Sequence, residues 1–418
     1  MIDQDISRLF APPPDQNKIV QSTYQVMWEH ILYDNNLKDY GFYEVGVNRY
    51  HNKIQAILDS QLLGKPVRWN YLDEEYDHYD WTQEPTESLP ELYAQRAQHL
   101  RENYDYLVLH FSGGSDSAQI IETFVDNHIH LDEVLIRGSF DRTERLAPGV
   151  FSAQNNYAEC LVQSIPLAQW VKDNHMPHLR ITLSETSNLI HDYFDRTPNW
   201  MEHSGGILTP HFHTKGTPES MAPHYRDLTE RGLRVAHIYG ADKPRLFRHK
   251  NVFYTQWQDT SIMSFNTVRD TDSPNPQYIE CFYWGTNAVK LQIKQLHTIK
   301  NYVKAHNLPD MMFDPKKAIE SGQTPTVAGR STDNFIASLV YYRTLPLLSE
   351  HLKPVATTVI KDMDAWFAQD PNSQAFQNYK KGIDYLGVIL PKHSICKGGI
   401  WSETGINAMH SKSRYLGT

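Results

Sequence analysis

Residues 112–117, with the sequence SGGSDS, combine the side chains and the backbone freedom that an anion-binding turn needs. Gly113 and Gly114 allow positive φ angles and a close approach of the main chain to an oxyanion, because they have no Cβ. Three hydroxyl groups complete the turn, on Ser112, Ser115 and Ser117. Hydroxyl and main-chain N–H groups donate hydrogen bonds to phosphate oxygens, so this composition predicts a phosphate-binding turn.

Asp116 is the acidic residue of the turn and gives it a second property. A carboxylate beside bound phosphates repels them unless a cation lies between the two. Mg²⁺ is usually bound by one or two carboxylates together with substrate phosphates. We therefore expect Asp116 to be a magnesium ligand and the turn to bind a magnesium nucleotide.

The segments on either side predict how the turn is positioned. The apolar run 104–111 is typical of a buried strand, and residues 118–127 have the spacing of a helix. A helix N-terminus presents unpaired N–H groups and a partial positive charge, and in a parallel sheet it lies at the carboxyl edge, where ligands bind. A strand, a glycine turn and a helix in this order form an anion site.

A second constellation lies at 234–250, where an apolar strand again runs into a glycine-bearing turn. Gly240 permits a tight exit from the strand, and Asp242 is a candidate second magnesium ligand. Four cations suited to neutralise pyrophosphate follow, namely Lys243, Arg245, Arg248 and Lys250. The alternative is a surface turn with a basic helix start, because Pro244 is also typical of a first helical turn.

SGGSDS matches every fixed position of the S-G-G-x-D-S/T motif, and on these residues the chain resembles the PP-loop ATP pyrophosphatase superfamily. The resemblance implies a flavodoxin-like (HUP-like) α/β domain that binds ATP and cleaves it between the α and β phosphates. Members include asparagine synthetase, NAD synthetase, tRNA-modifying ligases, sulfate adenylyltransferase small subunits and sulfonucleotide reductases. The Gly-Ala pair at 240–241 is similar to that of the sulfate adenylyltransferases, although those carry an arginine and an acid where this chain has DKPR.

The resemblance also implies roles for residues outside the turn. Backbone groups at the end of the second strand commonly hold adenine in the superfamily, which gives three candidates by position, Arg137, Gly138 and Ser139. An ordinary loop is the alternative there. The nucleotide-binding residues that we predict are 112–117, these three and Gly240. The predicted catalytic residues are Asp116, Lys243 and Arg245, and the predicted metal ligands are Asp116 and Asp242.

Three functions follow as hypotheses. The first is an ATP-dependent, AMP-forming enzyme that uses Mg²⁺ and activates a small-molecule or macromolecular acceptor for ligation, amidation or thiolation. The second is a sulfonucleotide reductase-like or sulfate-adenylating activity, in which Cys396 is the candidate nucleophile although the residues after it depart from the Gly-x-His of the reductases. The third is a nucleotide-binding module without turnover.

Alternating strands and helices predict an α/β fold with a parallel sheet covered on both faces. The candidate strands lie at 104–111, 132–138, 178–186 and 234–240. We expect three regions, a mixed N-terminal region at 1–100, an ATP-binding α/β domain at 101–260 and a mainly helical substrate region with a tail at 261–418.

Segments outside the central region give further expectations. Ser88 as N-cap and Pro90 in the first turn predict one helix, and residues 287–307 predict another with a core-facing stripe. The acidic stretch 70–88 predicts a solvated loop rather than an acidic binding face. The aromatic residues within 278–284 lead into the second helix, with core burial favoured over an acceptor pocket.

For two sets of polar residues the sequence leaves more than one role open. His211, His213 and His224 offer a zinc site, but a substrate-facing loop or plain surface is favoured. Lys412 and Arg414 belong either to a lid over the phosphates or to a frayed end.

Composition excludes several classes of protein. The 418 residues carry a formal net charge of -9, which provides no general field for nucleic acid or an anionic membrane. Three widely spaced cysteines predict neither a disulfide framework nor a cysteine-based metal site. Since no segment approaches ~18 apolar residues and the acidic start lacks the features of a secretion signal, we expect a cytoplasmic protein, with a homo-oligomer left open.

Overall fold

The computed structural model describes residues 41–138, 140, 160–200, 210, 224–240, 245–249, 251–259, 277–308, 339–341, 366–367, 370–389, 396–397, 400–401 and 409–418. The structural statements that follow concern these residues.

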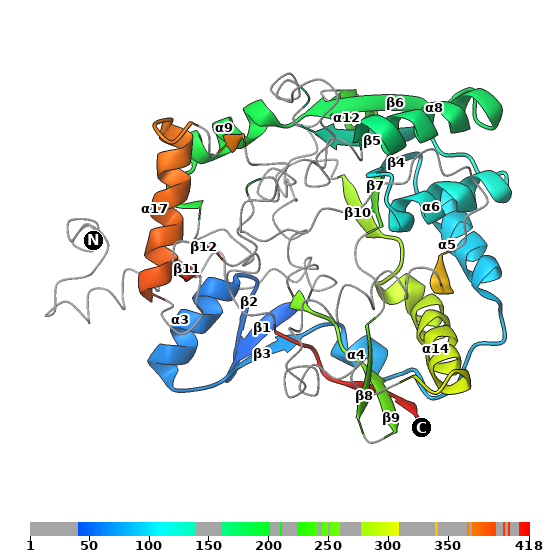
Figure 1. The fold of residues 1–418 in the computed structure, drawn as a ribbon, viewed down its shortest axis with the longest axis horizontal. Coiled ribbons are helices and arrows are strands. Elements are labelled where there is room, and N and C mark those ends of the chain that lie inside the picture. Colours follow the sequence, from blue (N-terminus) through cyan, green and yellow to red (C-terminus); the bar gives the residue numbers. More distant parts are fainter. Residues whose placement is uncertain are drawn as a thin grey trace, which may run out of the picture.

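The largest sheet in the described part of the chain, the central sheet, has five strands, all parallel (Figure 1). Its strands, in spatial order, are β10 (Tyr278–Cys281), β7 (Val235–Tyr239), β4 (Tyr106–His110), β5 (Glu133–Gly138) and β6 (Arg180–Glu185). Four of them coincide with the predicted strands, which confirms the α/β fold. The fifth, β10, is a strand that the sequence pattern does not reveal, and it extends the sheet beyond residue 260.

Alternate residues of the central strands enter different cores, because side chains along a strand point to opposite faces in turn. Leu107 and Leu109 of β4 pack in one cluster with Ile120, whereas Val108 packs on the other face with Tyr225. Helices therefore cover both faces. The helices that precede or follow the strands of the central sheet along the chain are α5 (Leu89–Asn103), α6 (Ser115–Asp126), α8 (Ile165–Asn174), α9 (Ser187–Arg196) and α12 (His224–Glu230). No helix in the part of the chain described above is long and apolar enough to cross a membrane.

Two predicted helices have the expected features. α5 starts with a capping box, in which the Ser88 hydroxyl accepts from the Glu91 N–H and the Glu91 carboxylate accepts from the Ser88 N–H, and Pro90 lies in its first turn. The helix α14 (Val289–Ala305) buries its predicted stripe, which consists of Val289, Ile293, Leu296 and Val303. The sequence patterns for these helices are confirmed.

A small antiparallel sheet precedes the central one along the chain. Its middle strand β1 (Phe42–Val45) pairs with β2 (Asn48–Tyr50) and β3 (Val67–Asn70). The helix α3 (Lys53–Leu63) packs on this sheet and is capped by the Asn52 side chain, which accepts from the Gln55 N–H at 3.0 Å.

The stretch 70–88 is not the solvated loop that its charges predict. It contains the short helix α4 (Asp73–Tyr76) and buries three aromatic side chains, those of Tyr71, Tyr76 and Trp81. The rings of Tyr76 and Trp81 lie 4.8 and 5.3 Å from the ring of Trp257. The prediction was wrong because partners far along the chain bury the aromatic residues, which the acidic composition of the window conceals.

A third sheet is formed late in the chain by β8 (Leu246–His249), β9 (Val252–Thr255) and β13 (Arg414–Gly417), all antiparallel. The residues after Pro244 therefore form a strand, and the alternative of a basic helix start there is wrong. The remaining elements are a 3-10 turn Thr286–Ala288, the helix α17 (Gln374–Ile389), which packs on α9, and the short strands β11 (Cys396–Lys397) and β12 (Ile400–Trp401).

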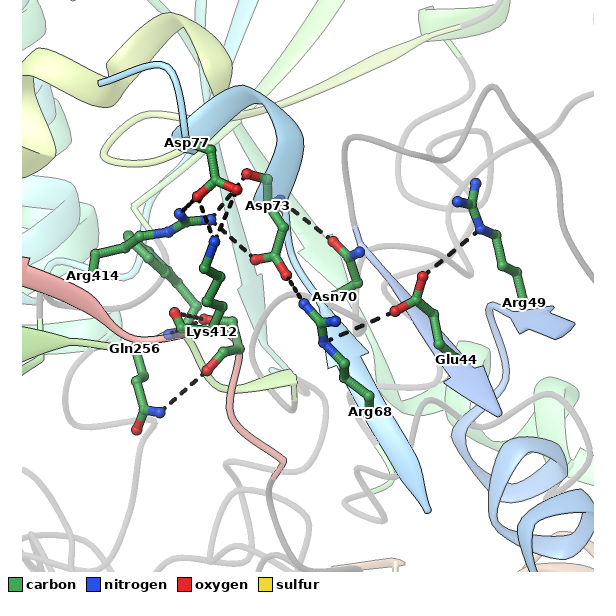
Figure 2. A network of polar contacts seen from close by, with 11 residues as sticks. Glu44, Arg49, Arg68, Asn70, Asp73, Asp77, Gln256, Lys412 and Arg414 are labelled. Carbon is green, nitrogen blue, oxygen red and sulfur yellow. Dashed lines mark hydrogen bonds and ion pairs between the residues drawn. The ribbon is translucent and has the colours of Figure 1, made fainter. Parts of the chain in front are cut away.

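The last residues of the sequence are fixed to α4 by a C-terminal clasp, formed by Lys412 and Arg414 with Asp73 and Asp77 (Figure 2). Lys412 Nζ lies 2.8 Å from Asp77 Oδ1, and Arg414 Nη2 lies 3.2 Å from Asp73 Oδ1. Hydrogen bonds from Lys412 and then Arg414 hold the pKa of the Asp77 carboxyl below its usual value. Both cations are therefore paired with acidic residues of α4 and its C-cap. They form neither a lid over phosphates nor a frayed end.

A buried ion pair joins the start of α3 to the segment that follows β9. Lys53 Nζ lies 2.7 Å from Asp259 Oδ2, and both side chains are 0% exposed. The same carboxylate accepts from the Tyr43 hydroxyl at 2.7 Å and from the Met409 N–H at 2.9 Å. Burial lowers the pKa of Lys53, and the Asp259 charge opposes this shift.

Candidate functional site at the carboxyl edge of the sheet

The predicted phosphate-binding turn lies between the end of β4 and the start of α6. Gly113 has φ +75°, a left-handed conformation that glycine adopts without strain. A Cβ on Gly113 would lie 2.6 Å from Ser164 Oγ and 2.9 Å from Ser164 N. The Ser164 hydroxyl donates to the Ser112 carbonyl at 2.5 Å. The end of the π-helical turn Cys160–Ser164 therefore supports the loop and leaves no room for a side chain at position 113.

The helix α6 begins at this turn, with Gly114 as its N-cap residue. The first N–H groups of an α-helix have no partner inside the helix, and glycine offers no side chain to cap them. The Ser117 hydroxyl donates to the Gly114 carbonyl at 3.3 Å and lies 3.3 Å from Ser112 Oγ, which stabilises the curl of the loop. With its partial positive charge, this helix start is suited to hold an anion.

Asp116 lies in the first turn of α6 and is partly exposed. Its Oδ1 accepts from the Ser115 hydroxyl at 3.2 Å. No group of three or more His, Cys, Asp or Glu side chains suited to a metal occurs within the described ranges. In nucleotide sites Mg²⁺ usually takes most of its ligands from phosphate oxygens and water, together with one or two carboxylates. The residues present fit that arrangement.

Gly240 brings the second predicted turn to the same place. β7 is the parallel neighbour of β4, so the two strands end at the same edge of the sheet. A Cβ on Gly240 would lie 3.1 Å from Asp116 C and 3.1 Å from Ser117 N. Gly114 and Gly240 therefore lie at one edge of the sheet, and Gly240 permits the close approach of β7 to α6.

The cations of the second turn are described only in part. Arg245 precedes β8, and its carbonyl accepts from the Thr255 hydroxyl at 2.8 Å. Arg248 donates to the Leu308 carbonyl at 3.0 Å and so fastens the β8–β9 hairpin to the segment that follows α14. Three predicted residues, Asp242, Lys243 and Lys250, lie outside the described residues. Their roles, like that of Arg245, stay predictions.

The predicted adenine-binding positions lie at the end of β5, next to β6. The Gly138 carbonyl accepts from the Thr186 N–H at 3.0 Å, and the Arg137 carbonyl accepts from the Cys160 thiol at 3.7 Å. Both carbonyls therefore have partners in the protein. Ser139 lies outside the described residues, so the adenine assignment stays a prediction.

A histidine pair near the same sheet edge was not singled out from the sequence. His110 Nε2 of β4 lies 2.9 Å from His237 Nδ1 of β7, and His237 Nε2 lies 2.6 Å from Gln277 Oε1. The ring of His110 stacks on Tyr239, with 3.9 Å between centroids. The signal available in the sequence was a histidine within each of two predicted strands, and only the structure shows that these strands are neighbours.

Burial lowers the pKa of His237 to about 4, so we predict an acid-sensitive fold. Between about pH 6.5, the usual pKa of an exposed histidine, and about pH 4, the unfolded chain binds this proton and the folded protein does not. The free energy of unfolding should therefore fall by about 3 kcal/mol as the pH falls through this window. Chemical denaturation at a series of pH values measures this loss. In a His237→Asn variant the free energy of unfolding should fall less steeply with decreasing pH than in the wild-type protein. In a variant of exposed His78 it should fall as in the wild-type protein.

The zinc alternative is not supported at His224. Its Nε2 lies 2.9 Å from Glu133 Oε2, and this buried carboxylate also accepts from the hydroxyls of Tyr106 and Tyr225 at 2.9 and 2.8 Å. The network fastens α12 to the sheet. His211 and His213 lie outside the described residues.

The cysteines give no support to the reductase hypothesis. Cys160 and Cys281 are buried thiols. Cys396 belongs to β11, and the position of its side chain lies outside what the structure describes.

The fold and the turn together define an α/β protein with a candidate anion site at the carboxyl edge of a five-stranded parallel sheet. Comparisons of the chain with protein-family models and with curated proteins found no match. The interpretation of the site therefore depends on its motif and its geometry.

Proposed function

We propose that the protein is an ATP-dependent, AMP-forming enzyme of the PP-loop type. The observation that carries the proposal is the start of α6, where Gly114 leaves the first turn without a side-chain cap and Gly113 adopts φ +75°. This helix start lies at the carboxyl edge of a parallel sheet, where α/β proteins bind their ligands. The SGGSDS motif at the same residues supports ATP as the anion.

In the proposed reaction an acceptor oxygen attacks the α-phosphorus of ATP, and the bond to the β-phosphate breaks to release pyrophosphate and leave an adenylated acceptor. A nucleophile such as an amine, ammonia or sulfur then attacks the acceptor and displaces AMP. The main-chain N–H groups of the turn bind the phosphates, and the Asp116 carboxylate holds Mg²⁺ against them. Lys243 and Arg245 neutralise the departing pyrophosphate. The protein contributes placement and charge stabilisation, which are the main requirements of phosphoryl and nucleotidyl transfer.

The experiment that tests this proposal is Asp116→Asn, assayed by calorimetry with ATP and Mg²⁺ and, with candidate acceptors added, by release of AMP and pyrophosphate. Loss of a charge-assisted interaction should weaken Mg·ATP binding about 10- to 100-fold. Asp126→Asn is the matched control, because Asp126 is exposed at the other end of the same helix. Unchanged affinity in Asp116→Asn would contradict the proposed site. Tight ATP binding by the wild-type protein without AMP or pyrophosphate would instead favour the module without turnover.

A further inference from the structure

Tyr283 reaches the candidate site from a part of the chain that the motif does not include. It follows β10, is 1% exposed, and its hydroxyl donates to the main-chain carbonyl of Asp116 at 2.5 Å. This carbonyl belongs to the first turn of α6. A buried hydroxyl therefore fixes the main chain of the residue whose side chain is the proposed magnesium ligand.

The hydroxyl of Tyr283 is the donor in this contact, and the main-chain carbonyl of Asp116 is the acceptor. A buried hydrogen bond of this kind restricts the acceptor to one position, because the hydroxyl has no water to replace its partner.

The position of Tyr283 is itself fixed from two sides. The Phe282 N–H donates to the Tyr239 carbonyl at 3.0 Å, which ties this segment to the end of β7. From α5, Arg96 donates to the carbonyls of Cys281 and Phe282 at 3.1 and 3.2 Å and to the Glu280 carboxylate at 2.7 Å. Because Arg96 holds three successive residues, the segment before Tyr283 is anchored to a helix on one face of the sheet.

From these contacts we infer that Tyr283 is a positioning residue for the nucleotide-binding turn. It holds the first turn of α6 in register with β7 and β10, so that the N–H groups and the Asp116 carboxylate are arranged before the ligand arrives. Such preorganisation increases affinity by reducing the ordering cost on binding. This inference rests on the proposed function and adds a residue to the same site.

Tyr93 provides a matched control for the test. Its hydroxyl is equally buried, donates to the Val340 carbonyl at 2.6 Å and accepts from Gln295 at 2.9 Å. Its ring contacts that of Tyr283 edge to face at 6.0 Å, and the two partners of its hydroxyl named above, Val340 and Gln295, lie outside the turn. Substitution of either tyrosine by phenylalanine removes one buried, hydrogen-bonded hydroxyl from the same hydrophobic core.

The experiment compares Tyr283→Phe and Tyr93→Phe by calorimetry with ATP and Mg²⁺, with thermal melting as a measure of stability. We expect Tyr283→Phe to raise the Kd about three- to tenfold, as loss of one hydrogen bond implies, and Tyr93→Phe to leave it within about twofold. Equal losses of affinity in both variants would reduce Tyr283 to a core residue and overturn the inference. Unchanged affinity in Tyr283→Phe would do the same.

Amide hydrogen exchange of the protein without nucleotide separates this inference from the proposed function. Residues 118–120, whose N–H groups bond back to the carbonyls of the first turn, should exchange about fivefold faster in Tyr283→Phe than in Tyr93→Phe, because local opening loses one hydrogen bond. If the wild-type protein binds no ATP, the proposed function fails and the exchange rates alone decide whether Tyr283 fixes the turn. Equal exchange in the two variants would overturn the inference.

Discussion

Replacing Gly113 by alanine is expected to lower the free energy of unfolding by about 3 kcal/mol and to abolish measurable ATP binding. The left-handed φ of +75° costs an L-residue about 1–2 kcal/mol. The added Cβ would also lie 2.6 Å from Ser164 Oγ and 2.9 Å from Ser164 N, and overpacking of this kind costs about 1–3 kcal/mol more. Since the backbone N of Ser164 cannot rotate away, the turn itself must move.

Gly64→Ala is the matched control for this prediction. Gly64 ends α3 with φ +60°, but a Cβ there has nothing within 4 Å. The control should lose only the backbone cost of about 1 kcal/mol and should bind ATP as the wild-type protein does. Urea denaturation and calorimetry measure the two effects. If Gly113→Ala is no less stable than Gly64→Ala, the contact with Ser164 does not determine the shape of the turn.

Lys53→Met is expected to destabilise the fold by about 3–5 kcal/mol, because it leaves the Asp259 carboxylate buried without its cation. The two side chains are 0% exposed, so water cannot replace the missing charge. Asp259 keeps its hydrogen bonds from Tyr43 and Met409, which do not neutralise it. Chemical denaturation measures the loss.

A second substitution identifies the cause of this loss. Asp259→Asn added to Lys53→Met removes the orphaned charge and should recover about 1–2 kcal/mol relative to the single variant. Lys380→Met is the control, since its pair with Asp384 is exposed and should change stability by less than about 0.5 kcal/mol. Equal effects of Lys53→Met and Lys380→Met would show that burial of the first pair has no energetic consequence.

Four strands of the central sheet were predictable because each is a run of apolar residues between turn residues, a pattern set by local sequence. β10 was not, because Tyr278–Cys281 is short and continues directly into aromatic residues and a helical pattern. Its place in the sheet depends on pairing with β7 and on Arg96 of α5, neither of which lies near it in the sequence.

The same distinction applies to the candidate site. The glycine turn and the start of α6 are contained in six successive residues, so their conformation follows from local chemistry. Ser164 and Tyr283 contact this turn from 52 and 167 residues away, and no spacing rule connects them to it. Residues that shape a site through long-range packing leave no motif, whereas residues that bind the ligand through a local turn do.

The C-terminal clasp has a consequence for synthesis on the ribosome. Asp77 and Arg414 are 337 residues apart, so at roughly 5–20 residues per second the nascent chain presents Asp77 for about 20–70 seconds before its arginine is translated. During that interval β9 also lacks β13, its neighbour in the finished sheet. Residues 409–418 therefore join the fold after translation of most of the chain, and a ribosome-stalled product lacking them would carry an open strand edge beside Asp77 without its two cations.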